Sequence, residues 1–315
     1  MKTFLIGSLF VTSLSLCAEE GKLKVDIIAN FSLDSVVPTD EINARLNYDV
    51  RSMWMSYPAY CYETYAPDIH KVIVMNNVER IVDFGSIPKD DRILFCWEPL
   101  YLAPDYYDQF SKVYTYNDDL VDGLKFFKFS YPVLRPMCTD IPPFDARKLC
   151  VMVTYNPTPD RIEVVRFFEG KDPEDFDLYG AEPIVDTPRY RGSIPGDSLG
   201  NEKFSVLKKY KFCMCFENKR INGYVTEKIF ACFAAGCLPI YLGPFNIEEY
   251  IPKSCYIDYS EFGTNDELYE YITTMSEERY EEYLASIKEY LASEQAQQFS
   301  WEDMIRVIDE AASAL

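Results

Sequence analysis

The feature that most constrains the fold of this 315-residue chain is a strand–helix–strand pattern between residues 210 and 242. Residues 210–216 (YKFCMCF) form an apolar run, a polar loop follows, and residues 226–235 have the pattern of a helix. Gly236 can end that helix in the left-handed conformation, and residues 237–242 (CLPIYL) form a second apolar run. Two strands joined through a helix pair in parallel, so this pattern predicts an α/β fold with a parallel sheet.

The alternation of strands and helices continues on both sides of this unit. Apolar runs with the length of buried strands occur at residues 24–29, 71–75, 92–96, 112–116, 149–154 and 176–180. A helix is expected at residues 160–169, and the chain is helical in pattern from about residue 266 onward. Ser300 and Asp303 can form a capping box for the last helix.

A proline-rich stretch at residues 130–145 interrupts this pattern, and we place a domain boundary there. We therefore predict two α/β domains with a cleft between them, one at residues 19–145 and one at residues 146–315. Residues 1–18, a positive start followed by an apolar run, are typical of a cleaved secretory signal peptide. That run is short for a membrane span, so we expect an exported or membrane-associated protein, with a cytoplasmic one as the alternative.

Composition narrows the class of partner. The chain has 51 acidic and 31 basic residues and a formal net charge of −20, which disfavours binding to nucleic acid. The ten cysteines show no zinc spacing, and buried free thiols are the preferred interpretation. His70 is the one histidine, so a general base, if the protein needs one, is expected to be a carboxylate.

Residues 217–228 carry the strongest chemical signal. In open α/β sheets ligands bind where strands end and helices begin, and a helix N-terminus favours phosphate. Lys228 adds a positive charge to the first turn, and the Glu227 carboxylate can accept hydrogen bonds from ribose hydroxyls. A nucleotide site and a capped helix with a solvated acid–base pair are both compatible with these residues alone.

The sequence of this region resembles glycosyltransferase family 10, the α1,3/1,4-fucosyltransferases. The resemblance lies in residues 210–218 (YKFCMCFEN), 223–230 (GYVTEKIF), 235–244 (AGCLPIYLGP), 249–254 (EYIPKS) and 260–262 (SEF). It is close over these segments and looser over the remainder of the C-terminal half.

This resemblance implies a GT-B fold, with two Rossmann-like domains facing a cleft, C-terminal helices, and GDP-fucose held mainly by residues 146–315. By matching positions, Asn218, Tyr224, Glu227 and Lys228 are expected to bind the donor. Glu227 would lie at the ribose and Lys228 at the diphosphate.

Two further residues follow from the same resemblance. Arg161 resembles the family arginine that pairs with the diphosphate, a task that suits a bidentate guanidinium, and Arg166 is the alternative. Family members are inverting enzymes in which an N-terminal carboxylate deprotonates the acceptor hydroxyl. Glu98 matches that position and is the candidate catalytic base, with a solvated glutamate before Pro99 as the alternative.

Asp175 and Asp177 match the Asp-x-Asp pattern of metal-dependent sugar transferases, which we interpret as coincidence. No tightly bound cofactor and no divalent metal are therefore expected. The expected partners are a nucleotide sugar and a glycan acceptor. A peripheral association with the membrane or with a lipid-linked glycan is a further option.

The chain also departs from the family. Residues 218–222 differ from the animal members, residues 19–145 are much less alike, and the start resembles a cleavable signal, which favours a bacterial-type member. Two alternatives stay open at this stage. One is a transferase that uses another nucleotide sugar, and the other is a catalytically inactive glycan-binding protein.

Overall fold

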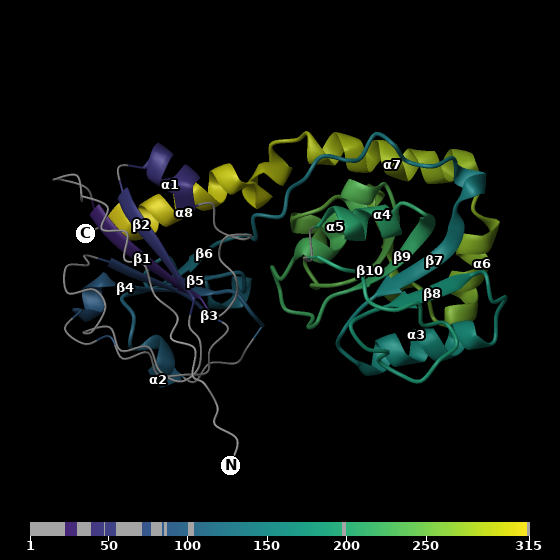
Figure 1. Cartoon of the computed structure of the whole chain (residues 1–315), viewed down its shortest axis with the longest axis horizontal. Helices are drawn as coiled ribbons and strands as arrows, with labels where there is room; N and C mark the ends of the chain where they lie inside the picture. Colours follow the sequence, from purple (N-terminus) through teal and green to yellow (C-terminus); the bar gives the residue numbers. More distant parts are fainter. Residues whose placement is uncertain are drawn as a thin grey trace, which may run out of the picture.

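Two parallel β-sheets organise the protein. The computed structural model describes residues 23–29, 39–46, 48–54, 71–76, 84, 87–99, 104–196 and 200–313. Within these ranges the first sheet has the strand order β2-β1-β3-β4-β5-β6 and the second has the order β11-β10-β9-β7-β8. Figure 1 shows the two sheets side by side, each with helices around it. The expected signal peptide at residues 1–18 and His70 lie outside the described residues.

The strands of the first sheet come from the N-terminal part of the chain. Its strands are β1 (Leu23–Ala29), β2 (Tyr48–Trp54), β3 (Lys71–Asn76), β4 (Arg92–Cys96), β5 (Lys112–Thr115) and β6 (Phe126–Lys128). The helices within this part are α1 (Thr39–Arg45) and α2 (Pro104–Tyr107). The apolar interiors of β3 and β4 are fully buried, as expected for central strands covered on both faces.

The second sheet follows the proline-rich stretch. Its strands are β7 (Lys148–Val153), β8 (Phe176–Tyr179), β9 (Tyr210–Phe216), β10 (Leu238–Leu242) and β11 (Ile257–Asp258). The helices are α3 (Pro159–Glu169), α4 (Asn201–Leu207), α5 (Glu227–Ala235), α6 (Asn265–Thr274), α7 (Glu277–Leu291) and α8 (Trp301–Ser313). None of the helices in the described ranges combines the length and apolar character that a membrane span needs.

The strand–helix–strand unit predicted from the sequence is confirmed as β9–α5–β10. Thr226 caps α5 by accepting a hydrogen bond from the backbone N–H of Lys228. Gly236 ends the helix with φ 62° and ψ 32°, the left-handed conformation that favours glycine. Every residue of α5 after Lys228 is buried, so tertiary packing on both sides fixes the position of its N-terminus.

The last helix returns to the first sheet. In Figure 1, α8 lies beside α1 and β2, whereas α7 runs along the second sheet. Tyr48 of β2 donates a hydrogen bond to Asp309 of α8 at 2.5 Å, and Lys112 of β5 reaches the carbonyl oxygen of Glu310 at 3.5 Å. The chain therefore crosses between the two sheets twice. The division into two domains at residue 145 remains a prediction.

Candidate functional site

A cavity lies at the carboxyl ends of the two central strands of the second sheet. From β7 the chain continues to β8 on one side, whereas β9 pairs with the other side of β7. This reversal of direction is the place where open α/β sheets bind ligands. The cavity has a volume of about 230 Å³. It is lined by Val153, Thr154, Tyr155, Asn156, Arg161, Ile194, Lys203, Asn218, Glu227 and Lys228.

Lys228 is held in place by a buried carboxylate. Its ammonium nitrogen lies 3.0 Å from Oε2 of Glu217, 3.0 Å from Oγ1 of Thr226 and 3.5 Å from Oε1 of Glu227. The Glu217 side chain is 0% exposed and also accepts hydrogen bonds from Thr226 and from the Tyr241 hydroxyl. Glu217 therefore fixes the direction of Lys228, whose side chain remains 21% exposed toward the cavity.

Arg161 is a buried residue in the first turn of α3, and it joins the ends of both central strands. Its guanidinium donates to the carbonyl oxygens of Asn156 and Phe216, and to Oδ1 of Asn218 at 3.2 Å. The structure thus brings together Arg161, Asn218, Glu227 and Lys228. Arg166, the alternative to Arg161, pairs with Glu169 on the same helix and does not line the cavity.

The charges in the cavity stabilise one another. Burial alone would lower the pKa of Lys228, but the carboxylates of Glu217 and Glu227 raise it above its ordinary value. Burial alone would raise the pKa of Glu227, but Lys228 and Lys203 lower it. The cavity therefore presents Lys228, Lys203 and Arg161 as cations beside one ionised carboxylate, in a chain whose net charge is −20.

Glu98 lies on the first sheet, two residues after the end of β4. Burial and then the negative charge of Glu227 raise the pKa of its carboxyl group above the usual value, while Lys228 opposes this shift. The carboxyl group of Glu98 therefore lies within electrostatic range of Glu227 and Lys228, which belong to the region of the other sheet. Its backbone is anchored because the Tyr116 hydroxyl donates to its carbonyl oxygen at 3.3 Å.

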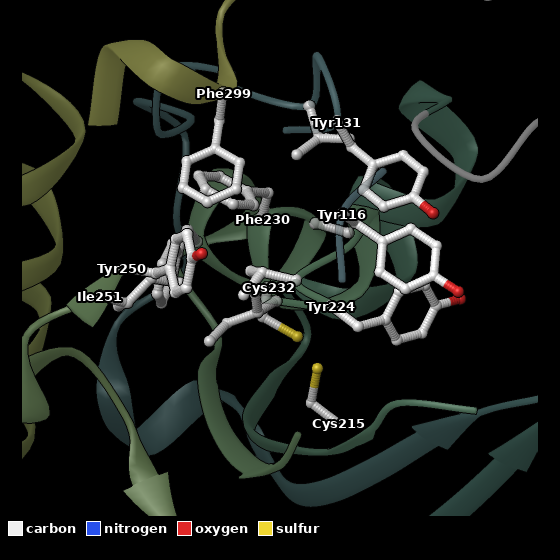
Figure 2. Packing of buried hydrophobic residues seen from close by; sticks show 14 of the residues in the cluster. Tyr116, Tyr131, Cys215, Tyr224, Phe230, Cys232, Tyr250, Ile251 and Phe299 are labelled. Carbon is white, nitrogen blue, oxygen red and sulfur yellow. The ribbon is translucent and has the colours of Figure 1, made fainter. Parts of the chain in front are cut away.

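Tyr224 is buried where the two sheets meet and does not line the cavity. Its ring lies 4.7 Å from that of Tyr116 and 6.0 Å from that of Tyr131, both of the first-sheet region, and Figure 2 shows these three rings together. Burial, followed by the charges of Glu217 and Glu98, raises the pKa of its hydroxyl, so this hydroxyl lies within the field of the acidic residues of both sheets.

The two aspartates of the Asp-x-Asp pattern have separate partners. The buried Asp177 carboxylate accepts from Tyr210 at 2.7 Å and from Lys148 at 3.0 Å, and it also pairs with Arg191. Asp175 accepts from Tyr269 instead. Across the described ranges, no group of three or more His, Cys, Asp or Glu side chains is arranged to hold a metal ion.

Lys203 and Tyr155 belong to the cavity, and sequence reasoning did not single them out. Lys203 comes from α4, a helix whose sequence carries no ligand-binding signal, so its place in the site depends on how α4 packs against α5. Tyr155 follows β7 and is 61% exposed, which is unusual for an aromatic ring. Its position directly before Asn156-Pro157, at a predicted strand end, was the signal that could have identified it.

Known proteins similar to this chain include fucosyltransferases. Residues 185–311 match the family described as "Glycosyltransferase family 10 (fucosyltransferase) C-term". An α-(1,4)-fucosyltransferase of Arabidopsis thaliana is 37% identical over 82 residues, which are 25% of this chain and 20% of that protein. The α-(1,3)-fucosyltransferase FucT of Helicobacter pylori is 36% identical over 96 residues, 30% of this chain and 20% of that protein. The matched part thus spans about a fifth of each relative.

A solved structure titled as an α1,3-fucosyltransferase with GDP-fucose superposes with a TM-score of 0.56 at 15% identity. The superposition covers 93% of this chain and 91% of that one. Two parallel sheets, with a cavity at the carboxyl ends of β7 and β9, define the class: the protein has the GT-B fold expected from the sequence. Within that class, residues 185–311 of the chain match glycosyltransferase family 10.

Proposed function

We propose that this protein is an inverting glycosyltransferase that moves fucose from GDP-fucose to a hydroxyl group of a glycan acceptor. The observation that carries the proposal is the cavity at the ends of β7 and β9, which gathers Arg161, Asn218, Glu227 and Lys228. Cations line this cavity although the protein as a whole is acidic. Relatives of this chain are named as fucosyltransferases, and the superposed structure is titled with GDP-fucose.

In the proposed reaction the donor diphosphate lies against Lys228, Arg161 and Lys203. These cations stabilise the charge that develops on the leaving GDP, so the residues themselves supply the electrostatic stabilisation. Glu227 accepts hydrogen bonds from the ribose, and Tyr224 supports the loop before Glu227 by packing on Tyr116. The exposed ring of Tyr155 offers a stacking surface for the base.

Glu98 acts as the general base from the opposite side. Its raised pKa increases the affinity of the carboxylate for a proton, which suits the removal of a proton from a sugar hydroxyl. The acceptor oxygen then forms a bond to C1 of fucose while the bond from C1 to the phosphate oxygen breaks. The electron pair leaves with GDP, and the single displacement inverts the configuration at C1.

The proposal is tested with the chain lacking residues 1–18. GDP-fucose, GDP-mannose, UDP-galactose and GDP are titrated separately, and release of GDP is followed with N-acetyllactosamine as the acceptor. We expect GDP and GDP-fucose to bind and GDP-fucose to be turned over. Lys228→Ala should lose donor binding, whereas Lys253→Ala, a surface lysine outside the cavity, should not.

The alternatives give different results. Turnover of another donor in preference to GDP-fucose would support a transferase for a different nucleotide sugar. Binding of N-acetyllactosamine without binding of any nucleotide would favour the glycan-binding protein and contradict the proposed donor site.

A further inference from the structure

Asp118, which follows a strand of the first sheet, binds one segment of the second-sheet region, residues 246–250, through its carboxylate. Asp118 follows β5, and its oxygens accept hydrogen bonds from the Tyr250 hydroxyl at 2.7 Å and from Nδ2 of Asn246 at 2.7 Å. On its own side it pairs with Lys128 at 2.6 Å. Burial alone would raise the pKa of Asp118, but these partners lower it, so the carboxylate stays ionised at neutral pH.

Asn246 and the backbone of Asp118 also contact the loop at residues 217–226, which precedes Glu227 and Lys228. Asn246 accepts a hydrogen bond from the backbone N–H of Gly223 at 2.9 Å, which links Asp118 to the loop at residues 217–226. The backbone N–H of Asp118 donates to the carbonyl oxygen of Asn222 at 3.1 Å, and the Asn222 side chain donates to Asp119 at 3.1 Å.

Gly223 shows how closely this loop approaches the first sheet. It adopts φ 80°, a conformation that side chains rarely tolerate. A Cβ atom at this position would overlap the carbonyl oxygen of Tyr116, Nζ of Lys128 and Oδ1 of Asp118. The contact between the loop and the Asp118 network therefore leaves no space for another side chain.

This network lies between the two halves of the proposed reaction. Glu98 belongs to the first sheet, whereas Glu227 and Lys228 follow the loop on the second. The loop also contacts the first-sheet region through the packing of Tyr224 on Tyr116 and Tyr131. Packed rings can slide past one another, whereas hydrogen bonds require a strict geometry. The Asp118 network is therefore suited to fix the position of the loop relative to the first sheet.

We propose that Asp118 is a positioning residue, which fixes the loop at residues 217–226 to the first sheet and so sets the separation between Glu98 and the donor site. This inference rests on the proposed fucosyl transfer. Asp118 does not line the donor cavity, so its effect on the reaction would pass through the position of the loop.

The test compares Asp118→Asn with Asp108→Asn. Asp108 also pairs with a lysine of the first-sheet region, Lys125, at 2.8 Å, but it is exposed and has no hydrogen-bond or ion-pair partner among the described residues of the second sheet. We expect the single-turnover rate of Asp118→Asn to fall by about 10- to 100-fold, since small displacements of reacting groups have effects of this size. GDP affinity should be unchanged, because the lining of the cavity is intact. Asp108→Asn should match the wild type in both.

A pH profile separates positioning from a general loss of structure. Burial and the charge of Glu227 raise the pKa of Glu98, and the charge of Lys228 lowers it. If the two sides separate, Glu98 becomes more exposed and more distant from Glu227, so the acid limb of the rate should move to lower pH in Asp118→Asn. Tyr250→Phe removes a single donor to Asp118, and its effect should be less than additive with that of Asp118→Asn.

Amide hydrogen exchange makes the outcome independent of the substrate. Faster exchange at residues 217–226 in Asp118→Asn but not in Asp108→Asn would support the positioning role, even if the wild type fails to turn over GDP-fucose and the proposed function is rejected. Unchanged exchange in this loop would overturn the inference, as would an equal loss of rate and GDP affinity with an unshifted pH profile.

Discussion

Glu217 and Glu98 both follow the carboxyl end of a central strand, one in each sheet, and their surroundings are opposite. Glu217 is completely buried, and Thr226, Lys228 and Tyr241 satisfy its carboxylate. Glu98 is half-buried, and no residue in the described ranges donates a hydrogen bond to its carboxylate. The fully partnered carboxylate organises the cavity of the second sheet, whereas the carboxylate with a raised pKa is suited to accept a proton.

The largest effect that this comparison predicts is the loss of chemistry in Glu98→Gln. Because the amide cannot accept the proton of the acceptor hydroxyl, we expect the single-turnover rate to fall by about 1,000-fold, within the range of general-base catalysis. GDP-fucose should bind as in the wild type. Glu174→Gln, a change at a side chain that is 78% exposed, serves as the control. A Glu98→Gln variant with a normal rate would assign the base to another residue.

Replacing Glu217, the other carboxylate of this comparison, should instead affect the stability of the protein and the binding of GDP. Glu217→Gln leaves Lys228 without its buried counter-charge, and we expect the free energy of unfolding to fall by about 3 kcal/mol. Denaturation in urea measures this change, and GDP titration should show weaker binding. Glu282→Gln breaks an exposed pair with Arg279 and should change stability little. Equal stability of the two variants would contradict the role assigned to Glu217.

A smaller effect is expected for the cation that sequence reasoning did not find. Lys203→Ala should weaken GDP binding about 10-fold, the equivalent of about 1.5 kcal/mol for one charge-assisted hydrogen bond. Lys208→Ala is the matched control, because Lys208 pairs with Asp140 and does not line the cavity. Calorimetric titration of GDP measures both variants. Unchanged affinity in Lys203→Ala would remove Lys203 from the diphosphate site.

The smallest effect concerns the pH dependence of the rate. Because burial and Glu227 raise the pKa of Glu98, the rate at saturating donor should fall as pH decreases through a value above 4.5. Glu227→Gln removes one of these causes, so the acid limb should move to lower pH. A shift to higher pH would mean that another group controls the acid limb.

The sequence predicted the parts of the fold whose signals are local. The ends of α5 followed from Thr226 and Gly236, and β9 and β10 followed from their apolar runs. The edge strand β2 (YDVRSMW) mixes polar and apolar residues and was not predicted, because the other strands were found from continuous apolar runs. The short strands β6 and β11 were not predicted either. The return of α8 to the first sheet depends on contacts such as Tyr48 with Asp309, which are 261 residues apart and leave no local pattern.

The residues of the candidate site also differ in whether a local sequence pattern could identify them. Asn218, Glu227 and Lys228 lie in one contiguous segment and could be identified from it, and Arg161 could be identified by resemblance. Lys203 and the supporting role of Glu217 could not, because they depend on how α4 and the end of β9 pack around α5. Tyr224 was expected at the donor, and the structure places its ring in the contact between the sheets.

The most direct measurement is a crystal structure of the Glu98→Gln variant with GDP-fucose bound. We expect the diphosphate to contact Lys228 and Arg161, the ribose to contact Glu227, and C1 of fucose to face residue 98 across the space between the sheets. A nucleotide bound outside the cavity at the ends of β7 and β9 would contradict the donor site. A different carboxylate facing C1 would contradict the assignment of Glu98 as the base.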